Sequence, residues 1–261
     1  MGAQVTEAPP ESHAGRTALE IAAAARAAQL AIRARLLRDV AKLWPALDAK
    51  RLNATFPAWS HAMSLLVRNY HGQSSQASAA AYRAAREVAT QSPAPRSLIH
   101  LAPEPSQEWL DRAFGYSGPG MLNKDTAQPN TALSTTMGTA SRIALDGGRT
   151  TTLETVKADP VAVGWYRVTD GAPCAFCALL ASRGIVYKDH SFDRSDAHFK
   201  GSGESKVHND CGCGFAPAFS HDQELPESSH RALEVYQNRG SGDALAAFRK
   251  AWAAHLASRS T

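Results

Sequence analysis

The stretch "DGAPCAFCALLASRGIVY", residues 170–187, holds two of the four cysteines in the chain, three positions apart. The other two cysteines lie in "HNDCGCGF", residues 208–215. A Cys-x2-Cys pair in a tight turn can place two thiolates on one tetrahedral ion, and a second pair from a distant loop completes the shell. The spacing therefore predicts a zinc site around which this segment folds.

The cluster offers five candidate ligands for four positions: Cys174, Cys177, His208, Cys211 and Cys213. The favoured sets combine Cys174, Cys177 and Cys211 with either His208 or Cys213. Catalysis needs an open coordination position, so a zinc ion held by four protein ligands is structural, and no catalytic residue is assigned. Three other interpretations stay open: two disulfides, a redox-active Cys-x2-Cys at a helix N-terminus, and ordinary buried thiols.

The residues around the cysteines predict a small α+β Cys/His module over residues 160–220. A β-branched and aromatic run at 161–170 favours a strand, and a Pro-containing turn follows it. Residues 174–182 suit a knuckle that passes into a short helix, which Gly184 ends, and "IVYK" suits a second strand. The chain from 190 to 214 is rich in His, Asp, Ser and Gly, which is typical of a loop.

Before the module, a flexible N-terminus (1–15) precedes a helical region over residues 16–150. Apolar residues at helical spacing predict helices at 17–44, 56–71 and 75–91, and a further helix in the segment 121–147. Thr17 and Glu20 form a plausible capping box, Pro45 ends the first helix, Gly72 closes the second, and Gly147 with Gly148 ends the last. The many alanines suit either a helical bundle or a surface that docks on a partner.

After the module, residues 225–261 are predicted to form a C-terminal helical tail of one or two helices, interrupted at Gly240–Gly242. The fold class is therefore mainly α, with a helical region, a small α+β module and C-terminal helices in that order. At 261 residues and 44% hydrophobic content, the chain is long enough to bury a core as one large or two small domains.

The formal net charge is +4, and the first 100 residues carry twice as many basic as acidic side chains. Such a surface is either simply solvated or meets nucleic acid or an acidic protein face. The first residues lack the charged start and apolar run of a signal peptide, and no run of about 18 apolar residues occurs. We therefore expect no membrane association.

The segment "WYRVTDGAPCAFCALLASRGIVY" followed by "HNDCGCGFAPAF" resembles the C-terminal region of tailed-phage minor head proteins, the Mu-F-like family and its actinobacteriophage relatives. The resemblance covers roughly residues 161–219. The matching positions are Trp165, Asp170, Gly171, Cys174, Cys177, Arg183, Gly184, Tyr187, His208, Cys211, Cys213 and Pro217.

The resemblance implies a minor capsid protein of the virion that is assembled in the host cytoplasm. It implies head morphogenesis near the portal, with the portal protein and the major capsid or scaffold protein as partners, and with DNA packaging or delivery and phage DNA as further possibilities. Some of these relatives are labelled capsid maturation proteases, so cleavage of capsid or scaffold protein is the alternative function.

A protease would draw its nucleophile and base from a His- and Ser-rich region of the chain. The candidates are Ser182, Ser191, Ser195, His190, His198 and His208, or Cys174 or Cys177 paired with His208. Neither a Gly-x-Ser-x-Gly elbow nor a His-Glu-x2-His zinc site occurs, and a thiolate bound to zinc is not free to attack. A DNA-binding zinc module is disfavoured because residues 174–213 have few arginines.

Overall fold

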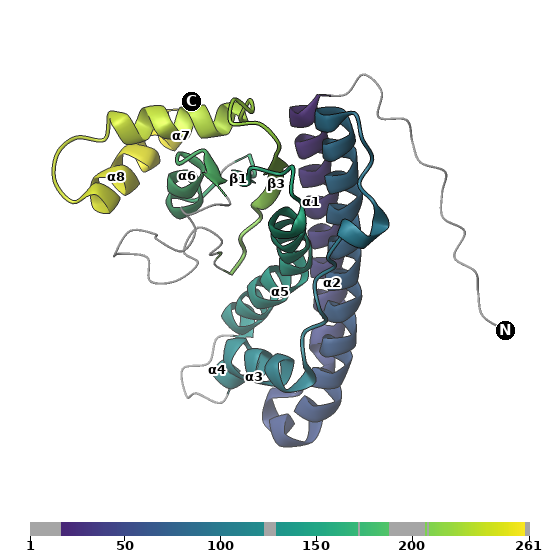
Figure 1. Ribbon diagram of the computed structural model, residues 1–261. Coiled ribbons are helices and arrows are strands. Elements are labelled where there is room, and N and C mark those ends of the chain that lie inside the picture. Colours follow the sequence, from purple (N-terminus) through teal and green to yellow (C-terminus); the bar gives the residue numbers. More distant parts are fainter. Residues whose placement is uncertain (1–16, 123–128, 172, 188–206, 208, 259–261) are drawn as a thin grey trace.

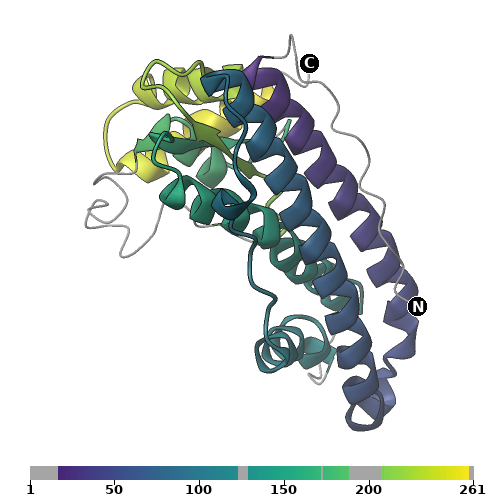
Figure 2. The same cartoon turned by 45° about the vertical axis from the view of Figure 1, so that its right-hand side comes forward.

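A long hairpin of two helices forms the spine of the protein (Figures 1 and 2). The computed structural model describes residues 17–122, 129–171, 173–187, 207 and 209–258, so the predicted flexible N-terminus (1–15) lies outside the described residues. Helix α1 (Ala18–Leu43) begins with the predicted capping box, in which the Thr17 hydroxyl accepts from the Glu20 amide at 3.2 Å and the Glu20 carboxylate accepts from the Thr17 amide. Two short 3-10 turns, η1 (Trp44–Ala46) and η2 (Ala49–Arg51), then reverse the chain.

Helix α2 (Leu52–Thr90) is one continuous element, so the prediction of two helices separated at Gly72 is wrong. Gly72 lies on the exposed face, and a Cβ built there meets no atom within 4 Å. One glycine costs a helix roughly 1 kcal/mol, which the burial of the opposite face of α2 exceeds. The helix ends where Gln91 takes a left-handed conformation with φ of 52°, just before the prolines.

Three further helices cover the hairpin after the turn η3 (Arg96–Leu98): α3 (Gln107–Ser117), α4 (Pro119–Leu122) and α5 (Pro129–Ala158). Gly118 separates α3 from α4. The main core lies among α1, α2, α3 and α5. Its largest fully buried side chains are Leu36, Val40, Trp59, Met63, Leu110, Phe114 and Ile143.

Helix α5 passes through Gly147 and Gly148, although the sequence predicted that it ends there. Both glycines lie where α5 meets α2. A Cβ at Gly147 would come within 2.3 Å of the His71 carbonyl oxygen, and a Cβ at Gly148 within 2.5 Å of the Ser78 hydroxyl. These glycines therefore serve the close approach of two helices, and they do not cap one.

A three-stranded antiparallel sheet lies beside one end of the hairpin (Figure 1), in the order β2-β1-β3. Strands β1 (Gly164–Val168) and β2 (Ile185–Tyr187) and helix α6 (Ala175–Ala181) occur where the sequence predicted them. Strand β3 (Gly214–Ala218) was not predicted. It contains Pro217, which lies opposite Trp165. A proline is compatible with an edge strand, because the N–H groups on the outer side of such a strand need no partner in the sheet.

The sheet packs on the helices through a second apolar cluster that includes Tyr82, Val156, Trp165 and Phe215. Helices α7 (Glu227–Gln237) and α8 (Ala244–Ala257) close the chain and pack on α6 through Leu179, Phe248 and Trp252. The predicted interruption between them holds, with φ of 86° at Gly240 and 108° at Gly242. The fold is mainly α, as predicted.

Among the described residues, no helix combines the length and the apolar character that a membrane crossing requires.

Candidate metal centre

Three of the predicted ligands meet in one buried cluster at the junction of the sheet and the helices. Cys177 lies on α6, whereas Cys211 and Cys213 lie in the segment that leads into β3. Their side chains are 1–2% exposed, and the three Sγ atoms lie within 4.8 Å of one another. The Sγ atoms of Cys177 and Cys211 are 3.3 Å apart.

Cys174 stands one helical turn from Cys177, at the N-cap of α6, and it is exposed. Its Sγ accepts a hydrogen bond from the Cys177 amide at 3.4 Å. The turn is thus a knuckle that leads into a helix, as the sequence predicted, with Cys174 beside the buried cluster. His208 lies outside the described residues.

The spacing of the buried sulfurs suits a tetrahedral ion. Zinc–sulfur bonds of about 2.3 Å in a tetrahedral site place two sulfurs about 3.8 Å apart. In this cluster the Sγ atoms of Cys177 and Cys211 are 3.3 Å apart, and all three Sγ atoms lie within 4.8 Å of one another. None of the four cysteines, all of which lie in the described part of the chain, forms a disulfide. Soft thiolate donors select zinc or another thiophilic ion. Cys177, Cys211 and Cys213 would hold the ion, with Cys174 or His208 as candidates for the fourth position.

The three thiols do not share their protons equally. Hydrogen bonds from the thiols of Cys177 and Cys213, together with the nearby charge of Arg149, lower the pKa of Cys211 well below its ordinary value. Hydrogen bonding to Cys174 and Cys211, together with burial, raises the pKa of Cys177. Cysteine binds a metal ion as the thiolate, so an ion bound by this cluster would displace the protons of its thiols.

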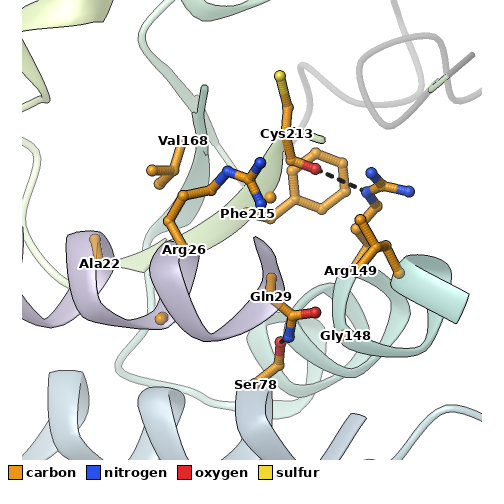
Figure 3. A pocket seen from close by; sticks show the side chains of 12 residues that line it. Ala22, Arg26, Gln29, Ser78, Gly148, Arg149, Val168, Cys213 and Phe215 are labelled. Carbon is orange, nitrogen blue, oxygen red and sulfur yellow. Dashed lines mark hydrogen bonds between the residues drawn. The ribbon is translucent and has the colours of Figure 1, made fainter. Parts of the chain in front are cut away.

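Two buried arginines flank the cluster, one from α5 and one from α1. Arg149 Nε donates to the Cys213 carbonyl at 2.9 Å, its Nη2 donates to the Cys211 carbonyl at 2.7 Å, and its Nη1 pairs with Asp146 at 2.7 Å. Figure 3 shows Arg149 reaching the Cys213 carbonyl, while the Arg26 guanidinium points from α1 toward the same segment. Burial lowers the pKa of Arg26 below its ordinary value.

Neither arginine was predicted from the sequence, although one signal was present. Arg26 lies on the same helical stripe as Ala22, Ile32 and Leu36, which are all buried, so its position faces the core of the protein. A charged residue on an apolar stripe indicates a buried counter-charge. Arg149 carried no such signal because the sequence predicted a helix end just before it.

Among the serine and histidine candidates for a protease, Ser182 lies in the described part of the chain. The Ser182 hydroxyl is buried and donates to the Leu179 carbonyl at 2.7 Å, which caps the end of α6. The other serine and histidine candidates, Ser191, Ser195, His190, His198 and His208, lie outside the described residues.

The fold and the site together define a mainly helical protein whose small sheet is tied to its helices around a buried cysteine cluster. The chain belongs to the VG15 protein family, whose model matches residues 16–239, from the start of α1 to just beyond α7. This is a family of viral gene proteins. No curated protein and no solved structure matches the chain.

Proposed function

We propose that this viral protein is a minor head protein of a tailed phage. It takes part in procapsid assembly near the portal and remains in the virion. The observation that carries the proposal is the buried cysteine cluster within a chain that matches a viral family over residues 16–239. The order and spacing of these cysteines are those in which the sequence resembles phage minor head proteins.

In this function the cysteine centre is a structural zinc staple. Cys177 lies on α6, and Cys211 and Cys213 lie in the segment before β3. An ion bound by these residues crosslinks the two segments, and Arg149 connects them to α5. Structural zinc contributes directly to folding in small modules of this kind.

The helical hairpin supplies the surface for the portal and for the major capsid or scaffold protein. Several large apolar side chains are exposed on the helical part, among them Leu65 on α2 and Trp109 and Tyr116 on α3. The basic excess in the first 100 residues suits contact with acidic protein surfaces or with phage DNA.

The first test is the metal content of protein purified without added metal, compared with Cys177→Ser, Cys211→Ser and the control Ser182→Ala. About one zinc per chain is expected in the wild type and in Ser182→Ala, and none in the two cysteine variants. Metal-free wild type with freely reactive thiols at Cys177 and Cys211 would reject the zinc staple.

The second test is co-expression with the portal and major capsid proteins of the same phage, followed by purification of heads. The proposal expects the wild type inside assembled heads and the unloaded Cys211→Ser variant in much lower amount. Heads that form normally and exclude the wild type contradict the proposal. Cleavage of the capsid protein that is lost with Ser182→Ala or Cys174→Ser, while folding is kept, would establish the protease alternative.

A further inference from the structure

Arg26 is a buried cation whose position the packing of the helices does not explain. Its side chain is 6% exposed, and Nε, Nη1 and Nη2 all lack a hydrogen-bond partner within the described part of the chain. It lies with Ala22, Val168 and Phe215 around a cavity of about 20 Å³ (Figure 3). A buried charge without a counter-charge is strongly unfavourable, so an anionic group belongs nearby.

The size of the cavity limits what that group can be. A volume of about 20 Å³ holds one water molecule. A phosphate or sulfate ion has several heavy atoms and does not fit. The counter-charge of Arg26 therefore comes from an anionic group of the protein itself, or from an anionic centre that the protein binds just outside this cavity.

Four charged or titratable groups face the guanidinium from the surrounding elements. Arg149 on α5 carries the same sign of charge, and Asp170 after β1 carries the opposite sign. Cys213 and Cys211 lie before β3, and each is a favourable electrostatic partner of Arg26 when it is a thiolate. Asp170 is close, but one of its carboxylate oxygens is itself buried without a hydrogen bond.

We propose that the metal-loaded cysteine centre is the counter-charge of Arg26, so that metal binding and the docking of α1 on the sheet stabilise each other. This inference rests on the proposed metal centre. Three or four thiolates outweigh the charge of one divalent ion, so the loaded centre is an anion. Arg26 and Arg149 approach it from two different helices and offset this charge.

The segment between the two cysteines is shaped for this approach. A Cβ at Gly212 would come within 2.7 Å of both Arg26 Nη2 and Asp170 Oδ2, so a larger residue there would displace the ends of both side chains. Arg149 holds the carbonyls on either side, those of Cys211 and Cys213. Partners that hold metal ligands in place in this way typically change metal affinity by about 10- to 100-fold.

The test uses the full-length chain with Arg26→Met, which removes the charge, and Arg26→Lys, which keeps it. Arg38→Met, at an exposed arginine of the same helix, is the matched control. Zinc affinity is measured by competition with a chromophoric chelator, and the unfolding midpoint is measured once with zinc and once with excess chelator.

Arg26→Met is expected to weaken zinc binding by about 10- to 100-fold, Arg26→Lys to retain most of the affinity, and Arg38→Met to change nothing. In zinc the methionine variant unfolds below the wild type. In chelator it unfolds at or above the wild-type midpoint, because it no longer buries an uncompensated charge. This reversal of sign is the signature of coupling between Arg26 and the metal.

Equal destabilisation of Arg26→Met with and without zinc, at unchanged zinc affinity, would overturn the inference. If Asp170→Asn then abolishes the effect of Arg26→Met, Asp170 is the counter-charge. If Arg26→Met does not fold, Arg26→Lys and Asp170→Asn replace it in the test. The inference requires that both of these variants keep their affinity for zinc. A wild type that binds no zinc rejects the proposed metal centre itself. Normal zinc binding that does not change in the Arg26 variants rejects only the coupling between Arg26 and the centre.

Discussion

The close approach of α5 to α2 at Gly147 predicts opposite effects of the same substitution at two glycines. Gly147→Ala adds a methyl group 2.3 Å from the His71 carbonyl oxygen, and that oxygen cannot rotate away because it belongs to the backbone of α2. Gly72→Ala is the matched control. It lies inside the same helix pair but on an exposed face, where the new methyl group meets no atom within 4 Å.

The magnitude follows from the distance. Ordinary contact for a Cβ begins at 3.4 Å, so α5 must move from α2 by about 1 Å to accommodate the added methyl group of Gly147→Ala. Overpacking of this kind costs up to about 3 kcal/mol, and the better helix propensity of alanine returns about 1 kcal/mol. The net loss is about 2 kcal/mol, or about 4–8 °C in Tm for a chain of this size. Gly72→Ala is expected to gain up to about 1 kcal/mol.

The assay is urea and thermal unfolding of wild type and both variants at one fixed zinc concentration, followed by far-UV circular dichroism. The expected order of stability is Gly72→Ala, wild type, Gly147→Ala. A Gly147→Ala variant as stable as the wild type would refute the close helix contact. Loss of stability in Gly72→Ala would refute the continuous α2.

Three further predictions concern buried polar groups. The fully buried Asp159 carboxylate accepts a hydrogen bond from Arg86 Nε at 3.0 Å. Asp159→Asn should therefore lower the free energy of unfolding, measured by urea titration, by about 3–5 kcal/mol. A loss below about 1 kcal/mol contradicts the pairing. Burial lowers the pKa of His71 below 6.5, so the unfolded chain binds this proton more readily than the folded protein. Stability measured in chelator should therefore fall as pH drops below about 6.5, and His71→Asn should flatten that slope; an unchanged slope argues against it. The Trp252 indole donates to the Pro173 carbonyl at 2.9 Å, so Trp252→Phe should cost about 1–2 kcal/mol, which unfolding of the variant measures directly.

Part of the candidate metal centre was predictable because the information is local. Two cysteines three positions apart before a short apolar run already indicate a knuckle and a helix, and α6 forms there with Cys174 at its N-cap. The second pair was recognisable from its spacing. The sequence alone left open which sulfurs meet, because Cys177 and Cys211 are far apart in the chain and come together only in the folded protein.

The arginines beside the cluster were not predictable in their role. Arg26 and Arg149 are separated from Cys211 by many residues in the sequence, and they meet it only after α1 and α5 pack on the sheet. From the sequence, Arg26 is one of several arginines on a helix. Its place on the apolar stripe of α1 indicates burial, but its neighbours from α5 and the sheet become visible only in the folded protein.

The sequence by itself determined the elements whose signals lie within a few residues: the capping box of α1, strand β1, helix α6 and the turn between α7 and α8. Only the tertiary structure decided that α2 and α5 run unbroken through their glycines and that three cysteines gather against two buried arginines. The physical reason is the same in both cases. A local conformational preference, such as that of glycine against a helix, is worth about 1 kcal/mol and decides the structure where no larger interaction acts. Where packing and buried charge contribute more, these interactions decide the structure instead.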